Sequence, residues 1–437
     1  MFQHLLEYEA GKNAAALLPI GVFIVLFAGS GLVSGDFYLM PTTLAFLLAL
    51  LVALLQNKKF TFEQKLYVAS SGAGDSNIIT MCLIYLLAGI FSAVVTAAGG
   101  VTSTVNLALS FIPAYLAVTG LFIMGCFISL SMGTSMGTIA ALAPIAMDIS
   151  SKTGYAMPLC IGAVVCGAMF GDNLSMISDT TIAAVRTQGC AMKDKFLANI
   201  KIVLPAAVLT GLIFLLLASG SSYQQGADSD YNLIQVVPYL LILVGALAGV
   251  NVFCLLIGGS VLSIMAGLYT QSLAADKLLG VIGSGLSSMY EITIIAILAA
   301  CISSLVRMNG GFAWILHFVQ SRVSGFRGAQ LGIGMLVLLM DAATANNTIA
   351  IVLAGPLAQK IASTYGIAPK RSASLLDIFA SVGQGLLPYG AQLLSAAALT
   401  GITPLDIMPY LYYPVLMLLS VLIFIFVNRG EGHMSKA

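Results

Sequence analysis

Charged side chains are scarce in this chain. Of 437 residues only 8% are Asp, Glu, Lys or Arg, and 59% are hydrophobic, whereas an ordinary soluble domain carries about 25% charged residues. This composition excludes a soluble globular protein. Apolar runs of about 17–25 residues, the length that crosses a bilayer, recur from end to end with short polar spacers between them. We therefore expect a polytopic, all-α membrane protein without a separate soluble domain.

Residues typical of metal or redox sites are also few. The three histidines lie far apart, and the seven cysteines lack the paired spacing of a zinc site or a CxxC motif, so we interpret them as packing residues. A net charge of +1 gives no electrostatic reason for nucleic-acid binding. We expect a protein that is not an enzyme and has no cofactor.

The second half of the chain repeats the first. TSMGTIAALAP at 134–144 aligns with NNTIAIVLAGP at 346–356, at a spacing of 212 residues. Three glycines have partners at the same spacing: Gly154, Gly171 and Gly189 match Gly366, Gly383 and Gly401. Because the spacing drifts by only a few residues over half the protein, one duplicated unit explains the pattern better than chance. The expected units are 1–220 and 221–437.

Each unit has the same order of apolar and polar segments. The expected spanning helices are 14–33, 37–56, 76–97 and 197–219 in the first unit, and 233–257, 259–275, 287–306 and 405–427 in the second. More polar stretches at 100–112 and 310–325 are expected to lie along the membrane interface.

Two further segments of each unit are interrupted by polar residues. The long apolar segments 115–150 and 329–363 contain SMGTSMGT and ATANNT near their middle, which predicts re-entrant hairpins with polar tips at mid-membrane. Segments 155–188 and 372–402 are predicted to be helices broken around GDNLS and GQGLLPYG. Each unit then has five transmembrane helices and one re-entrant hairpin, and the odd number of crossings inverts the second unit relative to the first.

Orientation follows from the basic residues. All lysines and arginines except Lys152 and Lys277 fall on one side of this predicted topology, and because Lys and Arg favour cytoplasmic loops, both termini are expected in the cytoplasm. Inverted repeats with paired broken helices are typical of secondary transporters, which bind their substrates near the midplane where the repeats meet.

The segment FGDNLSMISDTT at 170–181 is unusually polar for its apolar surroundings. Acids at membrane depth are costly and usually mark an ion or proton path, and a helix break there frees backbone carbonyls that can help to coordinate a cation. If the helix unwinds at Gly171–Asn173, Asp172 can point independently of Asp179. The candidate ligands in this segment are Asp172, Asn173, Ser175, Ser178, Asp179, Thr180 and Thr181.

The hairpin tips and the second unit add neutral groups. The tips contribute Thr134, Ser135, Asn346, Asn347 and Thr348. Gln384 stands at the position equivalent to Asp172, and Ala391 at that of Asp179, so a single acidic half predicts one dominant cation position. Single serines and threonines such as Thr138, Ser178 and Thr344 are equally well explained by close helix packing.

Three other buried acids have open roles. Glu291 begins a crossing, where a proton relay and an interfacial side chain that reaches for water are equally consistent with its place. Asp341, five residues before Asn346, is expected to face the site and is a second candidate for proton coupling. Asp377 is expected to meet water or Arg371.

FGDNLSMISDTT, followed by IAAVRTQGC, resembles the GD-x-x-S-x-x-SDTT region of NhaC-type Na⁺/H⁺ antiporters, a family of the ion-transporter superfamily. NVFCLLIGG at 251–259 and the stretch 284–312 are similar as well. Such motifs often carry Lys in place of Asn173 and Pro in place of Met176; here the basic side chain is missing.

This resemblance implies a Na⁺/H⁺ antiporter of the inner membrane, in which Na⁺ and H⁺ compete for Asp172 with Asp179 as the second candidate. It also implies a homodimer and an elevator-like motion of the hairpins and broken helices against a dimeric scaffold. The neutral amides of Asn346, Asn347 and Gln384 leave a second function open, a Na⁺- or H⁺-coupled carrier of a small organic solute such as an amino acid or a carboxylate. An ion channel or a membrane scaffold explains neither the duplication nor the buried acids.

Overall fold

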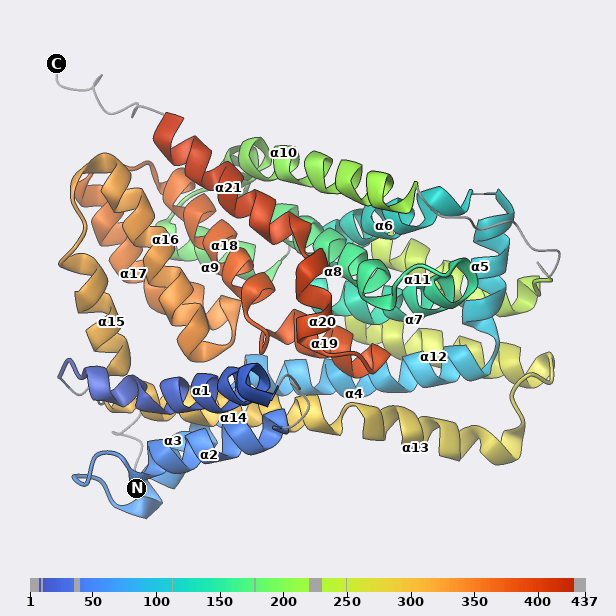
Figure 1. Ribbon diagram of the computed structural model, residues 1–437, viewed down its shortest axis with the longest axis horizontal. Coiled ribbons are helices and arrows are strands. Elements are labelled where there is room, and N and C mark those ends of the chain that lie inside the picture. The colour runs from blue at the N-terminus through green and yellow to red at the C-terminus, as the bar shows by residue number, and fades with distance from the viewer. Residues whose placement is uncertain are drawn as a thin grey trace.

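The computed structural model describes residues 8, 11–34, 40–111, 113–176, 178–219, 230–248 and 250–427. In these ranges every regular element is a helix (Figure 1). Six helical segments of the described residues are long and apolar enough to cross a membrane, or up to seven if a bent pair at Pro369–Tyr410 counts as one span, and further shorter apolar helices accompany them. The expectation of an all-α, multi-pass membrane protein is confirmed.

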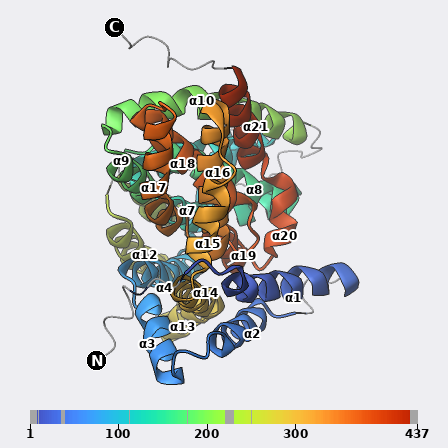
Figure 2. The same cartoon turned by 90° about the vertical axis from the view of Figure 1, so that its left-hand side faces the viewer.

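The helices form two layers, which are separated most clearly in Figure 2. The lower layer in both views consists of α1 (Leu18–Ser34), α2 (Thr42–Leu55), α3 (Phe62–Ala73), α4 (Ser76–Ala97), α12 (Val252–Tyr269), α13 (Leu278–Ser288) and α14 (Tyr290–Met308). The upper layer contains α6 (Ala117–Met132), α7 (Ser135–Thr153), α8 (Met157–Leu174), α9 (Asp179–Gln188), α10 (Met192–Ala218), α16 (Gly325–Thr344), α17 (Asn347–Thr364), α18 (Pro369–Leu386) and α21 (Tyr412–Val427).

The remaining helices join or extend these layers. They are η2 (Ala14–Leu17), α5 (Gly100–Phe111), η3 (Ala114–Leu116), α11 (Leu233–Leu247), η4 (Ala275–Lys277), α15 (Gly311–Gln320), α19 (Ala391–Thr400), α20 (Pro404–Ile407) and η5 (Met408–Tyr410). Helices α5 and α15, which correspond to the two predicted interfacial stretches, lie at opposite ends of the molecule in Figure 1. Each leads the chain from the lower layer to the upper one.

Two long antiparallel rods cross the lower layer, and the sequence interpretation missed part of each. Helix α3 precedes α4 where a loop was expected, and α13 precedes α14 where the third helix was expected to begin only at 287. The α3 start has a recognisable signal, a capping box in which Thr61 and Gln64 each accept a hydrogen bond from the other's backbone amide. Two contacts show that the rods run antiparallel: Gly72 lies against Ser304, and Gly89, farther along the first rod, lies against Gly285, which comes earlier in the second.

Other predicted boundaries shift by a few residues. Helix α11 ends at Leu247 and α12 begins at Val252, so the break falls before NVFCLLIGG rather than at 258. The last predicted helix is divided into α20, η5 and α21. Most relevant to function, α8 stays helical through Leu174. Gly171–Asn173 is therefore not unwound, and the break comes at Ser175, the last residue of the predicted GDNLS interruption.

Helix α8 is almost completely enclosed and touches α6 without intervening side chains. A Cβ atom added at Gly167 would lie 2.2 Å from the Phe122 carbonyl oxygen, and one added at Gly171 would lie 2.4 Å from the Cys126 carbonyl oxygen. Small residues permit this backbone approach in membrane helices. The contact fixes the last turn of α8, which carries Asp172, against the α6–α7 pair.

Substitution of Gly171 by Ala is therefore expected to lower the free energy of unfolding by about 1–3 kcal/mol, because the extra methyl group forces α6 and α8 apart. Gly120 on α6 is a matched control, since an added Cβ there meets nothing within 4 Å. Thermal unfolding of the detergent-solubilised variants checks the prediction. Equal melting temperatures for Gly171→Ala and Gly120→Ala would contradict the tight contact.

Candidate functional site

A cavity of about 440 Å³ lies between the two layers. Its upper side is formed by the interruptions between helices of the upper layer, and its lower side by α4 and the start of α12. All predicted ligands line it except Asn173, Ser175 and Thr181; the predicted residues that do so are Thr134, Ser135, Asp172, Ser178, Asp179, Thr180, Asn346, Asn347, Thr348 and Gln384. Residues from both halves of the sequence are thus brought into one site.

The turns between α6 and α7 and between α16 and α17 have the same local construction. Helix α6 ends at Gly133 with φ of 67°, and α16 ends at Ala345 with φ of 52°. The next residue caps the following helix in each case: Thr134 accepts a hydrogen bond from the Gly137 amide, and Asn346 accepts one from the Ile349 amide. The left-handed conformation is costly for Ala345, which has a Cβ, so the surrounding contacts must hold this turn in place.

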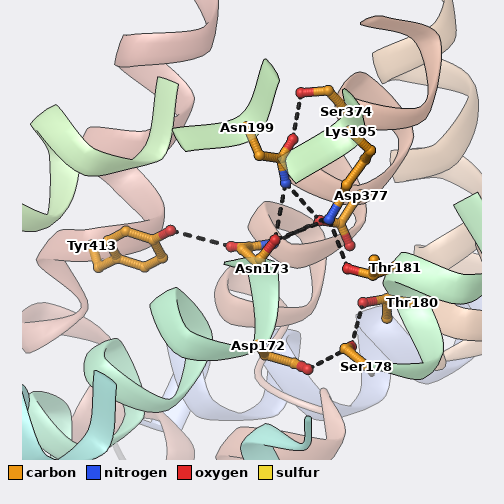
Figure 3. A network of polar contacts seen from close by, with 10 residues as sticks. All are labelled: Asp172, Asn173, Ser178, Thr180, Thr181, Lys195, Asn199, Ser374, Asp377 and Tyr413. Carbon is orange, nitrogen blue, oxygen red and sulfur yellow. Dashed lines mark hydrogen bonds and ion pairs between the residues drawn. The ribbon is translucent and has the colours of Figure 1, made fainter. Parts of the chain in front are cut away.

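Asp172 forms the acidic side of the cavity (Figure 3). The Ser178 hydroxyl donates to Asp172 Oδ1 over 2.6 Å and lies 3.0 Å from the Thr180 hydroxyl. Asp172 is 9% exposed, whereas Asp179, the first residue of α9, is exposed and lines the same cavity. Carboxylate and hydroxyl oxygens at a helix break form a ligand set that suits Na⁺.

The neutral side of the cavity is held together by amides. Gln384 donates to the Ala345 carbonyl oxygen over 3.1 Å and accepts from the Ala391 amide over 3.2 Å. Gln392 donates to the Ser135 hydroxyl over 3.0 Å and so connects α19 with α7. Gln384, at the position that the predicted repeat pairs with Asp172, therefore bridges two backbone segments. This task needs both a donor and an acceptor, which a carboxylate cannot supply.

The two candidates for proton coupling lie outside the cavity lining. Asp341 is fully buried behind Gln384, whose amide nitrogen lies 3.5 Å from Asp341 Oδ1, and Asp341 Oδ2 has no hydrogen-bond partner among the described residues. Glu291 is exposed and lines a different cavity, where it accepts a hydrogen bond from Thr43 over 3.2 Å. The structure thus brings Asp341 next to the site and leaves Glu291 apart.

A buried ion pair adjoins the site, and the sequence interpretation missed it. Lys195 Nζ lies 2.7 Å from Asp377 Oδ2, and both residues are 1% exposed (Figure 3). Asp377 was expected to meet water or Arg371, which was wrong; Arg371 instead donates to Gln330. Lys195 was counted among the basic residues of the cytoplasmic side, yet it is enclosed by protein. Its distance from Asp377 in sequence hides the pair.

Two amide side chains of the cavity were also overlooked. Asn251 caps α12 by accepting from the Phe253 amide over 2.9 Å and lines the cavity, as does Gln392. The signal for Asn251 was an Asn that interrupts an apolar run, the same feature that marked Asn346. Gln392 had no such signal, because a single Gln in a polar segment is ordinary.

Comparison with known proteins places the chain in a family of antiporters. A family model described as the Na⁺/H⁺ antiporter family matches residues 11–221 and 191–429. The chain is 23% identical to the Na⁺/H⁺ antiporter NhaC of Alkalihalophilus pseudofirmus, over 80% of this chain and 82% of that protein. It is 24% identical to NhaC of Bacillus subtilis, over 78% and 81%, and 23% identical to the arginine/ornithine antiporter ArcD of Halobacterium salinarum, over 80% of each. The chain belongs to the Na⁺/H⁺ antiporter family.

Proposed function

We propose that this protein exchanges Na⁺ for H⁺ across the inner membrane, with Asp172 as the residue that binds either ion and Asp179 as a second ligand of Na⁺. The observation that carries the proposal is a carboxylate at the end of α8 that faces a cavity lined by hydroxyl and amide groups. The carrier changes its orientation only when this carboxylate holds either Na⁺ or a proton. The movement of Na⁺ in one direction is then coupled to the movement of H⁺ in the other.

The proposed architecture is an inverted repeat of 1–220 and 221–437, each with five transmembrane helices and a re-entrant hairpin. Three pairs of left-handed residues at the same spacing of 212 support it: Gly133 with Ala345, Gly154 with Gly366, and Gly189 with Gly401. The antiparallel rods of the lower layer and the opposite positions of α5 and α15 support the inversion. We further propose cytoplasmic termini, a homodimer and elevator-like alternating access, as in the transporter families that the motif resembles.

Asp341 is proposed to take part in proton coupling. Its fully buried carboxyl group lies one side chain behind the cavity, and Gln384 connects it to the α16–α17 turn. A change in the protonation of Asp341 would act on that turn through Gln384. Glu291 is proposed only as a proton-accepting group of the separate cavity that it lines.

A second candidate function is coupled exchange of a small organic solute. The cavity volume lies within the range of about 300–1,000 Å³ that is common for small-molecule sites, and amides from Asn251, Asn346, Asn347 and Gln392 surround it. Helices α7, α9, α12, α17 and α19 all begin at the cavity, and helix N-termini favour a carboxylate. An ion alone needs neither this volume nor these amides.

Reconstitution in proteoliposomes separates the two candidates. With an imposed proton gradient, addition of Na⁺ is expected to shift the internal pH, while choline at the same ionic strength is expected to leave it unchanged. Arginine, ornithine and small carboxylates are tested in parallel. Movement of internal pH only when an organic solute is present, with no response to Na⁺, Li⁺ or K⁺ alone, would replace the proposal by the second candidate.

A further inference from the structure

Lys195 has the surroundings of a bound cation. It lies in the first turn of α10, and its ammonium group donates to three oxygen atoms: the Asn173 carbonyl at 2.9 Å, the Thr181 hydroxyl at 2.6 Å and Asp377 Oδ2 at 2.7 Å (Figure 3). These oxygens come from α8, α9 and α18. An ammonium group has three protons, so each proton has one partner.

The atoms around this ammonium are a backbone carbonyl oxygen at a helix end, a hydroxyl oxygen and a carboxylate oxygen. The same kinds of oxygen coordinate metal cations at broken helices. The Asn173 carbonyl belongs to the last turn of α8, at the negative end of the helix dipole. Asn199 donates to this carbonyl and to Asp377 Oδ2, both at 3.0 Å, and so orients the two acceptors. Asp377 Oδ1 has no hydrogen-bond partner among the described residues, which leaves a fourth oxygen of the cluster available.

The cluster adjoins the proposed Na⁺ site without sharing its cavity. Asp172 and Asn173 are consecutive residues of α8, but only Asp172 lines the cavity. The Asn173 side chain lies at the cluster instead, where it accepts a hydrogen bond from the Tyr413 hydroxyl and donates one to Asp377 Oδ2. The same helix end therefore adjoins two groups of oxygen atoms, one open to the cavity and one occupied by the Lys195 ammonium.

We propose that the Lys195 ammonium is a tethered cation that fills a second cation position, formed by Asn173, Thr181 and Asp377. This inference rests on the proposed function, because it concerns how many mobile cations the carrier holds. An ammonium attached to α10 cannot leave, so this position does not exchange and only the Asp172 site carries Na⁺. Removal of the ammonium with the oxygens kept in place then creates an additional site for Na⁺.

Lys195→Ala tests this directly, because it removes the charge and leaves room for Na⁺ and water. The purified variant is heated in detergent with NaCl or with choline chloride at equal ionic strength. Relative to wild type, Na⁺ is expected to give Lys195→Ala an additional rise in melting temperature of at least about 2 °C. The additional rise is expected to disappear in Lys195→Ala/Asp377→Asn, which lacks the carboxylate, and in Lys195→Met, whose side chain fills the space.

Two results would overturn the inference. One is an equal Na⁺ response of Lys195→Ala and Lys195→Ala/Asp377→Asn. The other is aggregation of Lys195→Ala in Na⁺ and choline alike while the double variant remains monodisperse, which would make the pair purely structural. If Na⁺ does not raise the melting temperature of the wild-type protein, that result would contradict the proposed Asp172 site. The comparison among the Lys195 variants would still decide the role of the ammonium.

Discussion

Replacing Asp172 with Asn is expected to reduce Na⁺-driven proton movement in proteoliposomes to the rate of protein-free liposomes. An Asn side chain fills the same space and its oxygen can still accept the hydrogen bond from Ser178, so the helix break should persist. The neutral amide, however, cannot exchange a proton for a cation. Internal pH after a Na⁺ pulse measures the effect, and size-exclusion chromatography with thermal unfolding checks that the variant is folded.

Two other aspartates serve as comparisons. Asp179→Asn, in the same cavity, is expected to weaken the apparent affinity for Na⁺ while exchange persists at high Na⁺. Asp148→Asn, whose side chain pairs with Lys152 outside the cavity, is expected to transport as wild type does. Wild-type exchange by Asp172→Asn would remove Asp172 from the mechanism.

Replacing Asp377 with Asn is expected to lower the free energy of unfolding by about 3–5 kcal/mol, the usual cost of breaking a buried ion pair. The Lys195 ammonium would remain enclosed, 1% exposed, without its counterion. Na⁺ cannot compensate for a missing negative charge, so the melting temperature is expected to be equally low in NaCl and in choline chloride. Thermal unfolding in detergent provides the measurement.

The location of the pair decides this magnitude. Asp148 and Lys152 form the other ion pair of the described residues, four residues apart on α7 and partly exposed; pairs of this kind contribute only about 0.3–0.5 kcal/mol, so Asp148→Asn should hardly change the melting temperature. Adding Lys195→Met to Asp377→Asn removes the orphaned charge and should restore much of the lost stability. No recovery in that double variant would show that the charge is not the cause.

Local patterns predicted much of the fold. The polar interruptions SMGTSMGT and ATANNT predicted the turns that follow α6 and α16, at Gly133 and Ala345. The predicted helix 76–97 coincides with α4. Helix α3 was missed because FEQKLYVASSGA has a mean hydropathy too low for a spanning segment, although its capping box was readable. The GDNLS motif predicted the break after α8, which comes at the last residue of the motif, Ser175, whereas Gly171 stays helical and serves the contact with α6.

The candidate site also has residues that the sequence predicted and residues that it did not. Residues in conspicuous polar motifs, such as Asp172 and Asn346, were predicted and line the cavity. Asp377 and Lys195 were misassigned because each lies near the polar end of its segment, and only the packing of α10 against α18 reveals that they meet. Sequence position gives the depth of a charged residue poorly when its partner belongs to the other half of the chain.

The distance between Lys195 and Asp377 along the chain, 182 residues, also has a consequence for biosynthesis. At about 5–20 residues per second, the ribosome adds α18 roughly ten to forty seconds after it has made the first turn of α10. During that interval the ammonium has hydroxyl and carbonyl partners but no counterion. The first half of the chain therefore lacks the counterion of its own buried ammonium until α18 has been made.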